Sequence, residues 1–570
     1  MRSGPIDAPG IRTGLTRRDV LREAILDHRG RLGVAALLFS LHQAGEALVP
    51  VLIGVVIDRA VTDATGGVGE LVLWLAVLGA VFATLSLSYR IGARRAEAAA
   101  EWAAHGLRLQ ITRRVLHPRG GAETGRLPGA LAGIATSDAQ RVGAINPALA
   151  NGLAAVVAML VGGIALVRVS RPLGLLVLVG GPLLLGLVHL LGRPLESRSE
   201  AEQERAAQAS GVAADLVTGL RVLKGIGAED TAIGRYRQTS RDSLAATLRA
   251  ARAQAGYEGA MLALSGLFLA VVAFAGARLA LAGQISVGQL VAAVGLAQFL
   301  LGPLQVFAWV SSELAQGRAS AGRIAEVLAG HPSVPAGTGT PELPAAGAMR
   351  LRGVGHAGLA DLDLEVAAGE LIGVVAADPA DAGALLRCLG REVDPETGSI
   401  ELDGVRLVDL DPDHVRSVVL VAAHDAELFG GTLGENIGAG APEAALAASR
   451  ADEVLRLLPG GVEGVLAERG SNLSGGQRQR VALARALTAD APVLVLHDPT
   501  TAVDTVTEAL IATGLRDLRP DRTTILVTTS PVLLAVTDRV VMLADGRISA
   551  DGRHHELIRD DETYRTVVLA

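Results

Sequence analysis

Six long apolar segments constrain the fold of this chain more than any other feature of its sequence. Each is dominated by Leu, Val, Ala and Gly and has about 20 residues or more, the length that a helix needs to cross a bilayer. The segments lie near residues 33–57, 70–90, 148–168, 172–192, 257–282 and 287–312. Together with a mean hydropathy of +0.40, they predict an all-α transmembrane domain with six spans over residues 31–325, after an N-terminal segment over residues 1–30.

The distribution of arginine predicts the orientation of these spans. Residues 91–147 and 193–256 form two long polar segments rich in Arg, whereas the loop over residues 58–69 is short and acidic. Because cytoplasmic segments carry the excess of Lys and Arg, we expect the N-terminus and both long segments to lie in the cytoplasm. Arg168 and Arg171, in the tight connection between the third and fourth spans, go against this rule.

The composition excludes several classes of protein. The net charge is −7, which argues against a nucleic-acid partner, and membrane lipid is the expected surrounding. A single cysteine, Cys388, excludes an internal disulfide. Met1 is followed by a polar stretch without an apolar core, so we expect no cleavable signal peptide. The one lysine is Lys224, in the second long polar segment, so any chemistry that requires a lysine must use this position.

The character of the sequence changes after the sixth span. Residues 326–347 include a run rich in Pro and Gly and are typical of a linker. Over residues 348–570, short β-like runs alternate with helical stretches, which predicts an α/β domain with a largely parallel sheet. The runs lie at residues 371–375, 418–423, 493–497, 524–528 and 539–543.

The string NLSGGQRQRVALARAL, residues 472–487, is the most specific motif in the chain. A Ser-Gly-Gly turn that opens a helix offers backbone N–H groups and a positive dipole end to a phosphate. On this string the sequence resembles the ATP-binding cassette (ABC) transporters, specifically exporter-type half-transporters with six spans and one nucleotide-binding domain. Residues 216–230, 285–304 and 319–332 are similar to that family's second cytoplasmic loop, sixth span and exit into the linker. The resemblance implies an α/β, P-loop NTPase-like cassette and the cofactors ATP and Mg²⁺.

The phosphate-binding loop departs from the family's G-x-x-G-x-G-K-[ST] pattern. In that loop, glycines let backbone amides wrap the phosphates, Lys reaches the terminal phosphates and Ser or Thr binds Mg²⁺. In residues 371–387 the lysine position is Ala382 and the hydroxyl position is Gly383. The glycine positions hold Ala376, Pro379 and Asp381.

These replacements oppose ATP binding. Asp378 and Asp381 place negative charge where a polyphosphate would lie, and Pro379 removes an amide donor. Lys224 belongs to the membrane half, so no shift of the alignment supplies a P-loop lysine. We therefore predict that the chain's own P-loop site does not bind or hydrolyse ATP normally.

Other positions that face the nucleotide in the family have also changed. By register, His497 replaces the Asp that orders Mg²⁺, and Asp498 replaces the catalytic Glu. Thr529 stands where a His contacts the γ-phosphate, and His424 stands where a Gln is usual. We therefore expect neither a catalytic residue nor a metal site in the chain's own nucleotide site. An alternative for His497 and Asp498 is that they end a strand without any chemical duty.

The intact signature string beside the changed P-loop predicts an obligate heterodimer. In the family, two cassettes close head to tail, and each ATP lies between one P-loop and the opposite signature string. The resemblance implies that ATP and Mg²⁺ are held mainly by the P-loop of a second half-transporter with intact Walker motifs. The residues of this chain that would contact that ATP are Ser474, Gly475, Gly476, Gln477 and Asp504. ATPase activity is accordingly expected only in complex with such a partner.

Polar residues within the spans are candidates for substrate contact. His42 and Glu46 share one face of the first predicted helix, with Gln43 beside them. Gln298 and the weaker candidate Gln305 lie in the sixth span. Ionisable groups at membrane depth are costly and usually line a cavity or pair with each other. The alternative is a hydrogen-bond cluster that packs helix against helix.

The sequence thus predicts the catalytically degenerate half of a heterodimeric ABC transporter of exporter fold, in the cytoplasmic membrane of a bacterium, with the nucleotide-binding domain in the cytoplasm. Two alternatives remain open at this stage. Exporter-fold pairs that import iron-siderophores look the same in sequence. A non-transporting sensor or regulatory subunit would use its cassette as a docking module only. The identities of the substrate and the partner are not predicted.

Overall fold

The computed structural model describes residues 6–7, 11–12, 15–62, 68–123, 125–337, 339, 345–424, 427–438 and 440–569. The chain divides into two compact units, which we describe separately. The helical unit contains residues Leu15–Ile111 and Gly129–Glu326. The second unit, which we call the cassette unit, contains Met1–Gly14, Thr112–Pro128 and Val327–Ala570.

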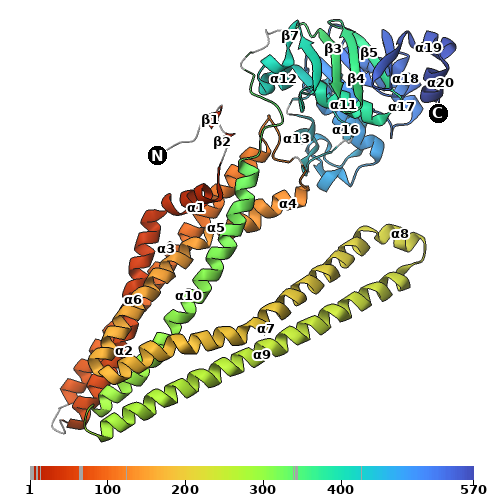
Figure 1. Ribbon diagram of the computed structural model, residues 1–570. Helices are drawn as coiled ribbons and strands as arrows, with labels where there is room; N and C mark the ends of the chain where they lie inside the picture. The colour runs from red at the N-terminus through yellow and green to blue at the C-terminus, as the bar shows by residue number, and fades with distance from the viewer. Residues whose placement is uncertain are drawn as a thin grey trace. The chain divides into compact units, whose positions relative to one another are not determined.

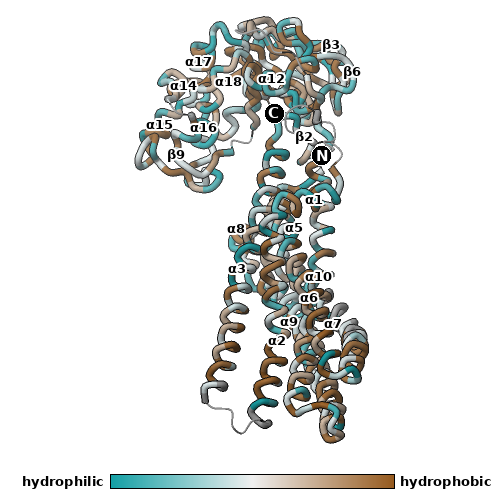
Figure 2. The backbone as a smooth tube through the Cα atoms, turned by 90° about the vertical axis from the view of Figure 1, so that its left-hand side faces the viewer, coloured by the Kyte–Doolittle hydropathy of each residue, from teal (hydrophilic) through white to brown (hydrophobic). Residues whose placement is uncertain are grey.

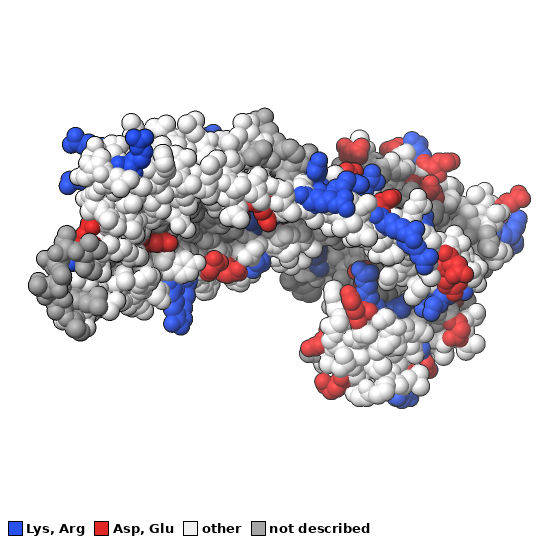
Figure 3. All heavy atoms as spheres, turned by 90° about the horizontal axis from the view of Figure 1, so that it is seen from below, with Lys and Arg blue, Asp and Glu red and all other residues white. Residues whose placement is uncertain are grey.

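Six helices in the described part of the chain are long and apolar enough to cross a membrane, which confirms the predicted transmembrane fold class. Their candidate spans are Arg29–Arg59, Val72–Val115, Pro128–Val169, Arg171–Val188, Glu229–Leu281 and Val287–Leu328. The apolar character of these helices is visible as the brown segments of Figure 2. Figure 3 shows, on one face, a broad expanse of uncharged side chains beside clusters of charged ones, as expected for spans that hold few charges.

The helices of this part of the chain extend well beyond the predicted spans (Figure 1). Two of them, α7 and α9, have 48 and 53 residues, or roughly 70–80 Å at 1.5 Å per residue, about twice the bilayer thickness. They lie side by side and are joined through α8, so the predicted polar segment 193–256 continues the fourth and fifth spans. The helices are α1 Arg17–Leu26, α2 Arg29–Thr62, α3 Val68–Val115, α4 Pro128–Gly133, a π-helical turn Ile134–Asp138, α5 Ala139–Gly143, α6 Ile145–Val169, α7 Arg171–Thr218, α8 Leu220–Gly225, α9 Glu229–Leu281 and α10 Val287–Leu328.

Small residues bring α2 and α10 into backbone contact. A Cβ added to Gly54 would lie 2.4 Å from the carbonyl oxygen of Gly288, and one added to Gly288 would lie 2.0 Å from that of Gly54. The carboxylate of Asp58 accepts from the N–H of Gly288 at 2.8 Å and from the hydroxyl of Ser286 at 2.5 Å. Close helix contact through glycine is the usual packing in lipid, and here it fixes α2 against the start of α10.

The described part of the cassette unit contains a six-stranded and a four-stranded sheet, besides two small two-stranded ones. The six-stranded sheet has the order β14-β13-β5-β12-β11-β8 and is parallel except for β14. Its strands are β5 Leu371–Ala376, β8 Val419–Ala422, β11 Val493–His497, β12 Thr523–Val527, β13 Arg539–Ala544 and β14 Arg547–Gly552. All five predicted β-like runs therefore form strands of this sheet. The α/β fold class is confirmed.

A second, antiparallel sheet was not predicted. It has the order β4-β3-β6-β7, with strands β3 Met349–His356, β4 Leu359–Val366, β6 Thr397–Leu402 and β7 Val405–Arg406. Helix α11 packs between the two sheets in the largest apolar core, while α16 and α17 cover the other face of the parallel sheet. The principal helices are α11 Pro379–Leu389, α12 Pro412–Val418, α13 Leu433–Ile437, α14 Glu443–Ala448, α15 Ala451–Leu457, α16 Gly475–Thr488, α17 Thr505–Leu518, α18 Pro531–Leu534, α19 His554–Asp560 and α20 Glu562–Leu569.

The described part of the predicted linker is fixed onto the cassette unit. The buried guanidinium of Arg391 donates to the carbonyl oxygens of Pro335, at 3.2 Å, and Val408, at 3.0 Å. The guanidinium of Arg114 donates to the carbonyl of Gly330 at 2.8 Å. Residues 338 and 340–344 of the predicted linker lie outside the described residues.

Candidate nucleotide site and membrane cavity

The chain between β5 and α11 is too short to wrap a phosphate. β5 ends at Ala376, residues 377–378 form a bend, and α11 begins at Pro379. Asp378 occupies the N-cap position of α11. The predicted loop is therefore largely replaced by the first turn of a helix, in place of the glycine-rich loop that cradles phosphates.

The amides at this position are used inside the chain. The N–H of Ala377 donates to the carbonyl of Leu543 at 2.9 Å. The N–H of Ala380 donates to the side-chain carboxylate of Asp378 at 2.8 Å, and Pro379 has no N–H. An anion at the start of α11 would have to displace the carboxylate that already caps the helix. These residues do not fit a nucleotide phosphate.

The carboxylate of Asp381 is buried, not exposed to an open loop. Asp381 is 5% exposed, and its Oδ2 accepts from the N–H of Gly546 at 3.2 Å. A Cβ at Gly358 would lie 2.0 Å from its Oδ1. Ala382, at the lysine position, is buried, while a Cβ at Gly383 would meet nothing within 4 Å. We expected the carboxylate of Asp381 to repel a phosphate. In the structure this carboxylate instead contacts Gly546 and Gly358.

The replaced residues at the ends of β8 and β11 lie together. The rings of His424 and His497 have centroids 5.7 Å apart, and Nε2 of His497 lies 3.8 Å from Oδ2 of Asp498. Asp498 has a φ of +43°, a left-handed conformation that Asp tolerates better than most residues. Thr529 follows β12 and is exposed. A cavity of about 360 Å³ beside these histidines is lined also by Arg485 and other residues of β8 and α16.

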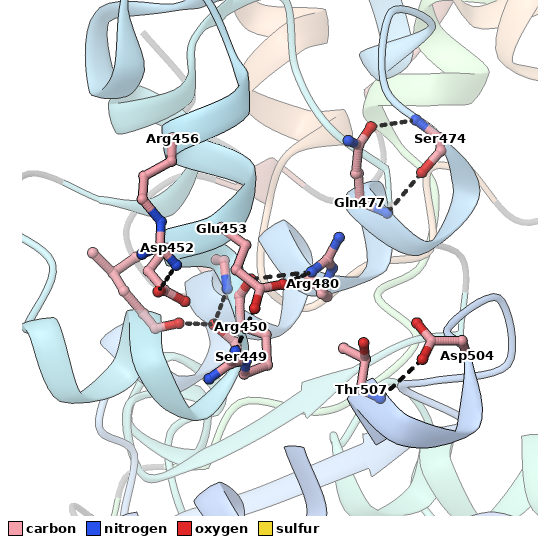
Figure 4. A network of polar contacts seen from close by, with 12 residues as sticks. Ser449, Arg450, Asp452, Glu453, Arg456, Ser474, Gln477, Arg480, Asp504 and Thr507 are labelled. Carbon is pink, nitrogen blue, oxygen red and sulfur yellow. Dashed lines mark hydrogen bonds and ion pairs between the residues drawn. The ribbon is translucent and has the colours of Figure 1, made fainter. Parts of the chain in front are cut away.

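The signature turn, residues 472–476, is well formed. Ser474 is the N-cap of α16: its hydroxyl accepts from the N–H of Gln477 at 3.2 Å, and the Gln477 side chain accepts from the N–H of Ser474 at 2.8 Å (Figure 4). Such a capping box fixes the start of the helix. A Cβ at Gly475 would lie 3.2 Å from the Cβ of Ala502, and one at Gly476 would lie 2.6 Å from its carbonyl oxygen. The glycines therefore permit close contact with the loop after β11, residues 498–504.

Gln479, which sequence reasoning missed, joins the signature helix to the loop after β11. Its Nε2 donates to the hydroxyl of Thr501 at 2.7 Å, and its Oε1 accepts from the N–H of Ala502 at 2.7 Å. Asp504 ends this loop and caps α17 by accepting from the N–H of Thr507 at 3.0 Å. That hydrogen bond lowers the pKa of Asp504. The structure thus brings the predicted residues Ser474 and Asp504 onto two turns that are held together.

A second missed group holds α15 against α16. The carboxylate of Glu453 bonds both Arg450 and, at 2.8 Å, Arg480 of the signature helix (Figure 4). Burial opposes ionisation of Glu453, but the two guanidinium groups outweigh it and lower its pKa. The Arg-rich pattern of residues 472–487 indicated charge on this helix but gave no signal of its partner on α15.

In the helical unit, four of the five predicted substrate candidates line a cavity of about 630 Å³. Gln43 and Glu46 of α2 face Gln298 and Gln305 of α10 across it. Sequence reasoning missed the other five lining residues, all on α10. Three of them lie on the same helical face as Gln298, at spacings of one, two and three turns. These residues are Gly302, Val306 and Trp309. The remaining lining residues are Phe299 and Pro303.

His42 lies outside the lining of this cavity. Its Nδ1 is 2.9 Å from the carbonyl oxygen of Leu85 on α3, and its ring packs near Tyr89 with centroids 5.2 Å apart. A carbonyl only accepts, so Nδ1 carries the hydrogen. In the neutral ring Nε2 is then an acceptor, 3.7 Å from the Glu46 carboxylate. His42 therefore packs α2 against α3, as the helix-packing alternative predicts, and it lies beside Glu46, which lines the cavity.

Comparison with known proteins agrees with this architecture. Residues 32–304 match the family of ABC transporter transmembrane regions, and residues 359–501 match the ABC transporter family. The ATP-dependent lipid A-core flippase of Thiobacillus denitrificans is 30% identical over 413 residues, 70% of this chain and 71% of that protein. A solved bacterial Atm1-family ABC exporter with ATP bound superposes with a TM-score of 0.74 at 24% identity, covering 95% of this chain and 97% of that one.

A multidrug efflux ATP-binding/permease protein of Mycobacterium bovis is 32% identical over 539 residues, which are 91% of this chain and 45% of the relative. The chain thus spans less than half the length of the mycobacterial relatives that it matches.

Six candidate spans joined to an α/β unit with a signature turn define a membrane transporter of exporter fold. This chain belongs to the ABC transporter family, as an exporter-type half-transporter with one transmembrane domain fused to one nucleotide-binding domain. ATP and Mg²⁺ are the cofactors that such a cassette implies.

Proposed function

We propose that this chain is the non-hydrolysing half of a heterodimeric ABC exporter in the cell membrane. A second half-transporter with intact Walker motifs would hold ATP and Mg²⁺ and cleave the nucleotide. One contrast carries the proposal. The amides between β5 and α11 are used inside the chain, while the signature turn keeps Ser474 at the start of α16 with two glycines behind it.

The residues of the signature turn suit contact with a nucleotide held by another chain. Ser474 accepts from Gln477, which leaves its own hydroxyl hydrogen for donation to a phosphate oxygen. The N-terminus of α16 adds N–H groups and the positive end of the helix dipole. Asp504 caps α17 as a carboxylate next to this turn. Bound ATP supplies the energy of phosphoryl cleavage that drives the transporter between two states.

Relatives support a two-half assembly and outward transport. The mycobacterial relatives are about twice as long as their matched region, which leaves room for a second half of similar size. The mycobacterial relative is named for multidrug efflux, and the relative from Thiobacillus denitrificans is named as a lipid A-core flippase. Outward transport is the analogous direction for this chain. The Arg-rich segments support a cytoplasmic location of its N-terminus and cassette. Transport in inverted vesicles, but not in right-side-out vesicles, would support export, and the reverse would indicate an importer.

ATPase activity of purified chains tests the heterodimer. We expect no activity from this chain alone and activity when it is paired with a half-transporter that has an intact P-loop lysine and catalytic Glu. Gly476→Ala should lower the activity of the pair by roughly tenfold or more, because its Cβ would lie 2.6 Å from the carbonyl of Ala502. Gly106→Ala is the matched control, since a Cβ at Gly106 meets nothing within 4 Å.

Two outcomes would contradict the proposal. ATPase activity from the chain alone, free of contaminants, would show that its own site is competent. An unchanged rate for the pair with Gly476→Ala would show that the signature turn takes no part in hydrolysis, as expected for a sensor or regulatory subunit.

A further inference from the structure

The cavity between α2 and α10 has a chemical character that indicates its ligand. Its volume of about 630 Å³ lies within the range of pockets that hold small organic molecules. We propose that it binds an organic cation with an apolar body, and that Glu46 is the counter-charge. This inference rests on the proposed transport function, because it names the class of substrate that the membrane half would select.

The charge of the cavity comes from one carboxylate. Glu46 is the single charged side chain among the lining residues, all of which are described, and none of them is basic. Its side chain is 48% exposed and lies near the middle of the candidate span Arg29–Arg59. A carboxylate at that depth is costly without a positive partner. The cavity therefore favours a cation and disfavours an anion.

The neighbouring histidine does not supply a permanent positive charge. Because Nδ1 of His42 carries the hydrogen that bonds the Leu85 carbonyl, the neutral ring turns an unprotonated Nε2 toward Glu46. The two groups lie 3.7 Å apart and form an ion pair only when the ring carries a second proton. A bound cation would lie beside a carboxylate that His42 neutralises only when its ring is protonated.

The other walls suit the rest of such a ligand. Trp309 and Phe299 offer aromatic rings, which attract cations through their faces, and Val306 and Pro303 add apolar surface. The Oε1 atom of Gln43 is buried without a hydrogen-bond partner among the described residues. The side-chain amide of Gln43 would have to turn toward the cavity before this oxygen could accept from a ligand N–H.

Two probes of the same shape and opposite charge test the proposal, namely tetraphenylphosphonium and tetraphenylborate. Each is titrated by equilibrium dialysis against the purified full chain and its Glu46→Gln variant. Comparing variant with wild type for each probe cancels the probe's partition into detergent. We expect Glu46→Gln to weaken phosphonium binding by about tenfold or more and to leave borate binding unchanged or tighter. Glu46→Asp, which keeps the charge, should retain most of the phosphonium binding.

Glu258→Gln is the matched control for loss of one carboxylate. Glu258 lies on α9, is exposed, and accepts from Gln254 at 2.7 Å, outside the cavity lining. This variant should bind both probes as wild type does. Equal phosphonium affinity of wild type and Glu46→Gln, or no phosphonium binding by wild type, would overturn the proposal.

A final experiment distinguishes a free organic cation from a cationic lipid headgroup as the ligand. In phosphatidylglycerol nanodiscs, addition of phosphatidylcholine should leave phosphonium binding unchanged, and displacement would assign the cavity to the lipid and overturn the proposal. These binding measurements need neither ATP nor the partner. Their failure is therefore distinguishable from failure of the heterodimer, which the ATPase test reports.

Discussion

At the scale of single residues, Asp381 shows why a changed P-loop position has more than one consequence. Its sequence position suggests a charge that repels phosphate, but the carboxylate accepts from the N–H of Gly546 and lies against Gly358. The side chain thereby ties the start of α11 to the turn between β13 and β14. Its contribution to folding is separate from any effect on nucleotide.

Replacing Asp381 should therefore destabilise the chain without restoring nucleotide binding. Asp381→Ala leaves the buried N–H of Gly546 without its acceptor, which costs about 1–3 kcal/mol. Asp381→Asn keeps a carbonyl oxygen at that place and should cost less. Thermal unfolding of the purified chain measures the first effect, and titration with a fluorescent ATP analogue measures the second. A gain of nucleotide affinity in Asp381→Ala would show that the charge of Asp381 alone prevents nucleotide binding.

The outcome for the membrane candidates also depended on single residues. Helical spacing placed His42 and Glu46 on one face of α2, and the structure confirms that they are neighbours. Spacing could not show that His42 hydrogen-bonds the carbonyl of Leu85 on α3, or that Glu46 lines a cavity with α10. Which neighbour a side chain meets depends on how helices pack, and the sequence of one helix does not contain that information.

At the scale of elements, α16 and the loop after β11 act as one piece. Gln479 forms two hydrogen bonds of 2.7 Å with the loop and is 9% exposed. These bonds set the position of Ser474, at one end of α16, relative to Asp504, at the end of the loop. The arrangement is one that a nucleotide contacted by both residues would require.

Gln479→Ala should consequently lower ATPase activity of the pair by several-fold and destabilise the cassette by about 2 kcal/mol, for two lost hydrogen bonds of about 1 kcal/mol each. Asp411→Ala is a control of similar cost, since Asp411 caps α12 by accepting from the N–H of Asp413 at 2.9 Å. Rates measured well below both melting temperatures separate the effects. If both variants lost the same activity, instability rather than positioning would explain the loss.

The elements themselves were predictable to different degrees. The strands of the parallel sheet were visible as short apolar runs, because such strands are buried on both faces. The antiparallel sheet was not visible, since β3 is interrupted by register shifts near Gly353 and Gly355 and its pattern departs from regular alternation. The lack of a lysine at the P-loop position was evident from Ala382, but the early start of α11 was not.

At the scale of the whole molecule, the composition of long segments predicts the class of protein. It does not predict the cavity, because the residues that line the cavity are far apart along the chain. Six apolar segments and one soluble half are properties of long stretches, so the sequence reveals them directly. The cavity joins Gln43 and Glu46 to a face of α10 more than two hundred residues away. The approach of Gly54 to Gly288 that brings these helices together has no signature in the sequence alone.

The orientation of the whole chain across the membrane can be tested by labelling with an impermeant maleimide. The native thiol gives little background, because Cys388 is 1% exposed and burial raises its pKa to about 11, which leaves little thiolate at pH 7. Gln284→Cys, exposed between α9 and α10, should be labelled on intact cells. Gln208→Cys, exposed on α7, should be labelled only after permeabilisation. The reverse pattern would place the Arg-rich segments outside the cell. The cassette continues from the end of α10, so it would then also lie outside, and the proposed contact with cytoplasmic ATP would be wrong.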